Sequence, residues 1–170
     1  QVSIAAIAPF FEQMAAIGCQ LTQADDTALA KVRPIGIACE AAMFRATCSV
    51  NTHKGAIFSL GLIATAAGFC SRVLNDVHAE TICRVAGSIA RPAEQDFQNE
   101  SGVDTNTHGQ ALFKKYGIQG IRGEAANGFP TVLGHALPVL RDLVKSGLYD
   151  HNAIHLQVLL HLMTQAEDTN

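Results

Sequence analysis

Polar residues that can hold an anion stand directly before the longest apolar run of the sequence. Residues 51–55 read Asn-Thr-His-Lys-Gly and precede the apolar run 56–70. Asn51 or Thr52 is a candidate N-cap, because a short side-chain oxygen can accept a hydrogen bond from an N–H group one turn later. A helix that begins here directs its unpaired N–H groups and the positive end of its dipole at whatever lies before it.

The next three residues add charge and room to this helix start. His53 supplies ring nitrogens, Lys54 supplies a full positive charge, and Gly55 lets a ligand approach the backbone closely. Together these are the components of a phosphate site at a helix N-terminus. In the alternative interpretation, Asn51 and Thr52 only cap a buried helix and Lys54 is solvated, and these residues alone do not decide between the two.

Composition limits the class of protein. The chain has 170 residues, of which 48% are hydrophobic and 16% charged, so it suits one folded domain over residues 1–170 and not a disordered segment. The net charge of −3 argues against a nucleic-acid partner. Five cysteines without a C-x-x-C pair indicate reduced, mostly buried thiols in a cytoplasmic protein.

The apolar run raises the question of a membrane span. Residues 55–71 are flanked by Lys54 and Arg72, lie at the short limit for a span, and contain Ser59 and Thr65. A helix that is apolar all round is equally typical of the centre of a soluble bundle. We therefore expect no membrane partner.

The spacing of apolar residues predicts helices, and no stretch alternates as a strand does over more than a few residues. Pro34 is expected to separate two helices, Pro92 to end one, and Pro138 to bend one. Glycines at every third position from 117 to 123 indicate a backbone that passes close to another helix or a ligand. The prediction is an all-α, single-domain bundle around the buried helix 52–72, with the other helices at about 3–17, 27–32, 35–47, 76–91, 107–116, 129–145 and 151–165.

Short segments spread over nearly the whole chain match the motifs of one known family. The most specific reads N-T-H-K-G-x-x-F-S-x-G, within residues 50–61. The chain resembles the triphosphoribosyl-dephospho-CoA synthase family, which makes the precursor of the citrate lyase prosthetic group and has a sister branch that serves malonate decarboxylase. The other matching segments are 33–36, 43–47, 108–116, 122–125, 128–130, 135–138 and 168–170.

The chain departs from the family pattern in several places. Ser49 stands where members often have Gly, and Phe129 stands where they often have Tyr. A Pro-Lys-Pro-Gly-Leu-Val-Asp motif upstream and an Arg-Gly-Gly motif after residues 168–170 are absent. On this basis we expect the chain to be truncated at each end, to fold, and to be inactive on its own while retaining weak ATP binding.

The resemblance implies a reaction that joins ATP to 3′-dephospho-CoA and expels adenine. The ribose 2′-hydroxyl of dephospho-CoA attacks C1 of the ATP ribose through an oxocarbenium-like state, which a carboxylate can stabilise. The hydroxyl needs a base and the adenine a proton donor. The triphosphate needs cations, N–H groups and, we expect, Mg²⁺.

The resemblance also suggests which residues do this work. The expected catalytic groups are Glu40, His53, His108 and Glu124. The expected ATP-binding residues are Arg45, Asn51, Thr52, Lys54, Gly55 and Arg122, and the expected Mg²⁺ ligands are Glu124 and Asp168.

Structural interpretations stay open beside these roles. Arg122 and Glu124 can form only an ion pair, Glu40 can neutralise Arg33 or Arg45, and His108 can cap its helix.

The implied pathway leads to the acyl carrier protein of citrate lyase. The same chemistry for malonate decarboxylase is an alternative, and so is a non-catalytic helical binding module. The sequence leaves homo-oligomer formation open. A thermal shift with ATP and Mg²⁺ separates an enzyme from a scaffold.

Overall fold

The computed structural model describes residues 2–99 and 120–165, and these residues form helices and no strand. The all-α prediction is therefore confirmed for this part of the chain. The helix expected at 107–116 lies outside it. The elements are α1 (Val2–Gln20), α2 (Asp26–Ala46), α3 (Lys54–Phe69), the π-helical turn η1 (Cys70–Leu74), α4 (Ala79–Asn99), α6 (Gly120–Ala126), the π-helical turn η2 (Val132–Ala136), α7 (Leu137–Ser146) and α8 (His151–Gln165).

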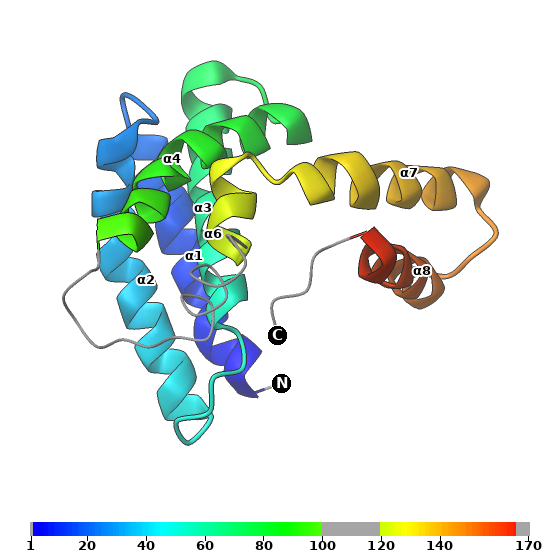
Figure 1. The fold of residues 1–170 in the computed structure, drawn as a ribbon, viewed down its shortest axis with the longest axis horizontal. Helices are drawn as coiled ribbons and strands as arrows, with labels where there is room; N and C mark the ends of the chain where they lie inside the picture. The colour runs from blue at the N-terminus through cyan, green and yellow to red at the C-terminus, as the bar shows by residue number, and fades with distance from the viewer. Residues whose placement is uncertain (1, 100–119, 166–170) are drawn as a thin grey trace.

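Helix α3 lies at the centre of the bundle, in contact with α1, α2 and α4 (Figure 1). Its closest neighbour is α1, and two glycines permit that closeness. A Cβ at Gly18 would lie 2.0 Å from the Thr65 carbonyl oxygen, and one at Gly68 would lie 2.1 Å from the Ala15 oxygen. Only glycine lets the two backbones approach so far, so α1 has a fixed position along α3.

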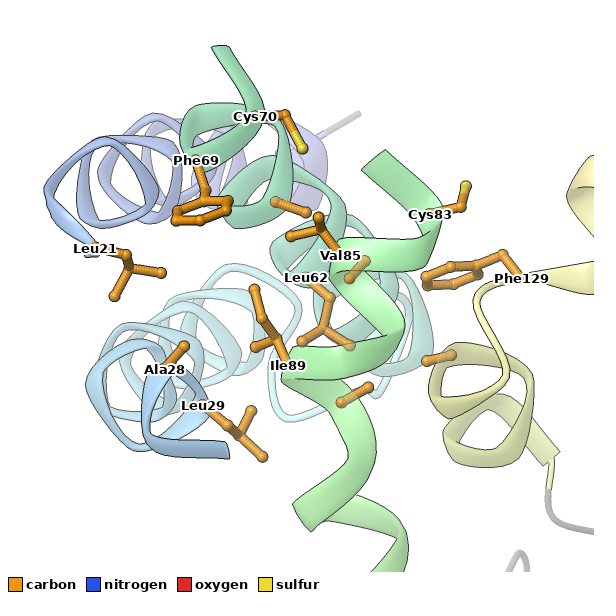
Figure 2. Close-up of a cluster of buried hydrophobic side chains, with 14 of the residues drawn as sticks. Leu21, Ala28, Leu29, Leu62, Phe69, Cys70, Cys83, Val85, Ile89 and Phe129 are labelled. Atoms are coloured by element: carbon orange, nitrogen blue, oxygen red, sulfur yellow. The ribbon is translucent and has the colours of Figure 1, made fainter. Parts of the chain in front are cut away.

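Two clusters of apolar side chains form the core. One joins α1, α2 and α3 through residues such as Met14, Met43 and Ile57. The other packs α3 against α4, where Leu62 faces Ile89 (Figure 2). Most of the thiols are buried, as expected, because Cys39, Cys70 and Cys83 are buried and Cys19 and Cys48 are exposed.

The expected helix breaks at Pro34 and Pro92 are wrong. Helix α2 runs through Pro34 and α4 runs through Pro92 without interruption. A proline inside a helix costs about 3 kcal/mol, because it removes one hydrogen bond and crowds the preceding turn. Buried residues on both sides, such as Val32 and Cys39 around Pro34, tie each helix to the core and outweigh that local cost.

The helix expected at 129–145 is confirmed from residue 130 onward, with a π-helical turn just before Pro138. There the Leu137 N–H donates to the carbonyl of Val132, five residues back, which accommodates a proline that has no N–H to donate. Gly147, with φ of 64°, ends α7. Helices α7 and α8 then form a hairpin that extends away from the central bundle (Figure 1).

Within residues 2–99 and 120–165, length and composition alone would allow two helical segments, Val2–Gln20 and Lys54–Leu74, to cross a membrane. In the structure these two segments pack closely on each other, and the second is more buried than the first. Core helices of soluble bundles have the same composition. This composition is therefore weak evidence for a span.

Candidate functional site

The loop between α2 and α3 holds two successive residues in the left-handed region. Cys48 has φ of 52° and Ser49 has φ of 67°. The conformation is fixed locally, because the Ser49 N–H donates to the Phe44 carbonyl at 2.8 Å and the Thr47 hydroxyl donates to the Val50 carbonyl at 2.6 Å. Non-glycine residues pay about 1–2 kcal/mol each for this region. A strained reversal thus leads directly into the start of α3.

The N-cap residue of α3 is His53, which makes no side-chain capping bond, so the expected N-cap at Asn51 or Thr52 is wrong. The Asn51 Oδ1 nevertheless accepts a hydrogen bond from the Lys54 N–H, the first N–H of the helix, at 3.1 Å. The first N–H of this helix to reach a carbonyl four residues back is that of Ile57, which donates to His53 at 2.8 Å. The N–H groups of Gly55 and Ala56 therefore lie in the first turn and point out of the helix end.

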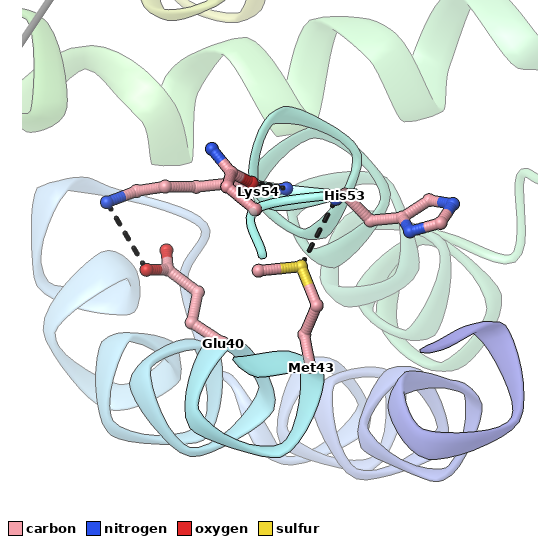
Figure 3. Close-up of polar contacts among 5 residues, drawn as sticks. Glu40, Met43, His53 and Lys54 are labelled. Carbon is pink, nitrogen blue, oxygen red and sulfur yellow. Dashed lines mark hydrogen bonds and ion pairs between the residues drawn. The ribbon is translucent and has the colours of Figure 1, made fainter. Parts of the chain in front are cut away.

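Lys54 and Glu40 meet beside this helix end (Figure 3). The Lys54 Nζ lies 3.4 Å from the Glu40 Oε2, and their side chains are 54% and 30% exposed. The partner of Glu40 here is Lys54, whereas the sequence had suggested Arg33 or Arg45. An exposed ion pair contributes about 0–1 kcal/mol, so an anionic ligand can draw Lys54 away at little cost.

The ring of His53 points away from Lys54, toward α1 (Figure 3). Its Nδ1 lies 2.9 Å from the Thr52 hydroxyl oxygen and 2.7 Å from the hydroxyl oxygen of Ser3. Thr52 thus contacts the His53 ring, while Asn51 accepts from the Lys54 N–H. The structure places the Lys54 ammonium and the His53 imidazole on opposite sides of the helix start.

Nothing in the described part of the chain requires a glycine at position 55. Its φ is not in the left-handed region, and a Cβ built on it meets no atom of the described chain within 4 Å. Alanine would favour the helix by roughly 0.5–1 kcal/mol at most positions. The open space lies beside the outward-pointing N–H groups, where a bound anion would need it.

Glu124 lies on α6, a helix of seven residues that packs on α4. Its two carboxylate oxygens accept hydrogen bonds from the Thr131 N–H at 2.9 Å and from the Thr131 hydroxyl at 3.0 Å. Glu124 thereby satisfies the start of the helical segment that leads into η2. Arg122, on the same helix, donates to the Ala93 carbonyl at 3.4 Å.

The turn after α6 is a second strained position. Gly128 and Phe129 have φ of 78° and 59°, and the Phe129 N–H donates to the Glu124 carbonyl at 2.8 Å, closing the helix end. A bulky residue in the left-handed region is a true outlier. Phe129 is held there because its side chain is only 2% exposed and packs in the core (Figure 2).

The remaining residues expected at the site fall outside this centre. Arg45 is exposed in the last turn of α2, where its charge suits the negative end of the helix dipole. His108 and Asp168 lie outside the described residues. Within 2–99 and 120–165 there is no group of three or more His, Cys, Asp or Glu residues that could hold a metal by itself.

Sequence reasoning missed Ser3. Its hydroxyl contacts both Thr52 and His53 from 49 or more residues away. Neither spacing nor composition predicts a contact between residues so far apart in the sequence. The close packing of α1 on α3 brings them together.

Comparisons with known proteins agree on one family. The family model described as CitG, ATP:dephospho-CoA triphosphoribosyl transferase, matches residues 1–170. A protein of Pectobacterium atrosepticum named 2-(5''-triphosphoribosyl)-3'-dephosphocoenzyme-A synthase is 43% identical over 172 residues, which cover 100% of this chain and 56% of that protein. The chain thus spans little more than half the length of this relative. No solved structure matches it.

Proposed function

This chain belongs to the ATP:dephospho-CoA triphosphoribosyl transferase family, and from that premise we propose that it serves a transferase that joins ATP to 3′-dephospho-CoA with release of adenine. One observation carries the proposal furthest. The start of α3 combines outward N–H groups, the movable cation of Lys54 and open space at Gly55. These features together form a site for a phosphate chain.

The triphosphate of ATP is proposed to lie at this helix end. The helix dipole places about half a positive charge there, and the N–H groups of Gly55 and Ala56 donate to phosphate oxygens. Lys54 turns from Glu40 to the phosphates, and Asn51 keeps the first turn in place. Thr52, Arg45 and Arg122 complete the proposed ATP-binding set.

The chemistry requires a balanced transfer at C1 of the ATP ribose. The bond from C1 to the adenine nitrogen breaks as the bond from the dephospho-CoA 2′-oxygen to C1 forms. The proton of that hydroxyl passes to a base, proposed to be Glu40 or Glu124, and a proton reaches adenine from His53 or His108. Glu40 suits the role of base, because it loses its ion-pair partner when Lys54 turns to the phosphates.

Mg²⁺ fits the donor chemistry of the proposed site, with Glu124 and Asp168 as its ligands. A carboxylate offers about four acceptor positions, so the two hydrogen bonds from Thr131 orient Glu124 and leave lone pairs for a cation. Held by these carboxylates, Mg²⁺ would neutralise charge on the triphosphate.

The pathway and compartment are also proposals. The product is expected to supply the acyl carrier protein of citrate lyase in the cytoplasm, and the malonate decarboxylase branch is the alternative with the same chemistry. Deletion of the gene, followed by mass spectrometry of the citrate lyase and malonate decarboxylase carrier proteins, would distinguish the two branches. Loss of the prosthetic group from only the malonate decarboxylase carrier would reject the citrate lyase assignment.

The function is tested by measuring adenine release from ATP and dephospho-CoA by chromatography, with the full-length protein. The Pectobacterium atrosepticum relative serves as the positive control. We expect adenine and a product carrying the triphosphoribosyl group. A protein that is neither stabilised by ATP with Mg²⁺ nor able to release adenine would be the non-catalytic helical module instead.

A further inference from the structure

Ser3 is a buried polar residue whose hydroxyl contacts residues far away in the sequence. Among the described residues the buried polar side chains are Ser3, 5% exposed, and Thr65, 0% exposed. Thr65 donates to the Gly61 carbonyl of its own helix at 2.8 Å. Ser3 instead reaches from the first turn of α1 to the residues that precede α3.

Three contacts join Ser3, Thr52 and His53 in a triangle. The Ser3 hydroxyl oxygen lies 2.7 Å from the His53 Nδ1 and 3.0 Å from the Thr52 hydroxyl oxygen. The Thr52 oxygen lies 2.9 Å from the same Nδ1. Both hydroxyls therefore surround one ring nitrogen, and neither contacts Nε2.

The two hydroxyl oxygens suit a ring whose Nδ1 carries a proton. Nδ1–H donates to the Ser3 oxygen and the Ser3 O–H donates to the Thr52 oxygen, because a hydroxyl both donates and accepts. In the neutral ring Nε2 then has the free lone pair. When the ring gains a proton it does so at Nε2, and the contacts at Nδ1 are unchanged.

We propose that Ser3 is a positioning residue that, together with Thr52, holds the Nδ1 of His53 and leaves Nε2 as the nitrogen that exchanges a proton with a ligand. This inference rests on the proposed function for the role of His53 in the reaction. The position of Ser3 is set by α1, which is fixed along α3 by the close contacts at Gly18 and Gly68. The hydroxyl allows the ring to change protonation state without moving, whereas a carboxylate partner would favour only the charged ring.

The first test is the ring itself, observed by ¹⁵N NMR of the histidine side chains in the protein without substrates. His53 is assigned through the loss of its signals in His53→Gln. We expect its neutral ring to carry the proton on Nδ1. Ser3→Ala should shift the ring signals toward a mixture of the two tautomers, and Ser3→Thr should restore them.

Ser88→Ala is the matched control, because the Ser88 hydroxyl donates only to the Arg84 carbonyl of its own helix at 3.3 Å. It should leave the His53 signals unchanged. Thr52→Val removes the other hydroxyl that contacts Nδ1 and should also shift the His53 ring signals. A neutral His53 ring with its proton on Nε2, or a ring that is unchanged in Ser3→Ala, would overturn the inference.

The second test is adenine release by the full-length protein. Ser3→Ala should lower kcat by about tenfold and leave KM for ATP within about twofold, the pattern of a proton-transfer group that is bound but misplaced. A raised KM with unchanged kcat would contradict the positioning role. If the NMR changes occur as expected but no form of the protein releases adenine, the inference about the ring holds and the proposed function fails.

Discussion

Replacing Gly55 by alanine separates the requirements of the fold from those of a ligand. Gly55 lies in the first turn of α3, and an added Cβ meets no described atom within 4 Å. Alanine in a helix is favoured over glycine by about 0.5–1 kcal/mol, and we take the lower half of that range for a first-turn position. For a domain of this size the gain corresponds to a rise in Tm of roughly 1–2 °C.

The same methyl group should weaken the binding of ATP. Each Cα–Cβ bond of a helix is tilted toward the helix N-terminus, so the new methyl would point at the proposed triphosphate. We expect the dissociation constant for ATP with Mg²⁺ to rise at least about tenfold, which corresponds to roughly 1.4 kcal/mol. Thermal unfolding measures the first effect and titration calorimetry the second.

Gly134→Ala provides the matched control, because a Cβ there also meets no described atom within 4 Å. It should raise Tm by a similar amount and leave ATP binding unchanged. The reasoning would be refuted if Gly55→Ala raised Tm while ATP bound as tightly as before. That result would favour the interpretation in which residues 51–55 only cap a buried helix.

The remaining predictions test the neighbours of this site and the fold. Lys54→Ala should weaken ATP binding by roughly 2–4 kcal/mol in calorimetry. It should change the free energy of unfolding by less than about 1 kcal/mol, because its ion pair is exposed. Ser49→Gly should stabilise the fold by about 0.5–1 kcal/mol in urea melts by relieving a φ of 67°, and Ser49→Ala should not. Asp168→Asn should raise the Mg²⁺ concentration needed for turnover, and a titration that overlays that of the parent would remove Asp168 from the metal site. The Thr81 hydroxyl and the His78 N–H lower the pKa of Asp76, so its contribution to stability is present above about pH 4 and is lost as the pH falls through the lowered pKa. Asp76→Asn should therefore be less stable than the parent at neutral pH, and the difference should shrink as the pH falls below about 4, as measured by urea melts.

The sequence predicted the helices well where a local pattern decided them. Apolar spacing located the helices at 2–20 and 151–165, and it located the start of α3 to within two residues. It failed at Pro34 and Pro92, where tertiary packing on both sides of the proline outweighs a local cost. It also gave no helix for the glycine-rich segment at 120–126, because glycine's low helix propensity conceals a short helix that its contact with α4 stabilises.

In the candidate site, too, the sequence predicted the residues of a local motif but not the contacts between distant helices. Asn51, Lys54 and Gly55 are adjacent in sequence, so a motif was enough to find them. The contacts of Glu40 with Lys54 and of Ser3 with His53 depend on how α2 and α1 pack against α3. Contacts of this range follow from the assembled bundle and not from any local pattern.

A crystal structure with ATP and Mg²⁺ tests the central proposal most directly. We expect phosphate oxygens of the triphosphate within hydrogen-bonding distance of the N–H groups of Gly55 and Ala56. The Lys54 ammonium should have turned from Glu40 to the phosphates. A triphosphate bound elsewhere, with Lys54 still paired to Glu40, would contradict the assignment of the α3 start as the ATP site.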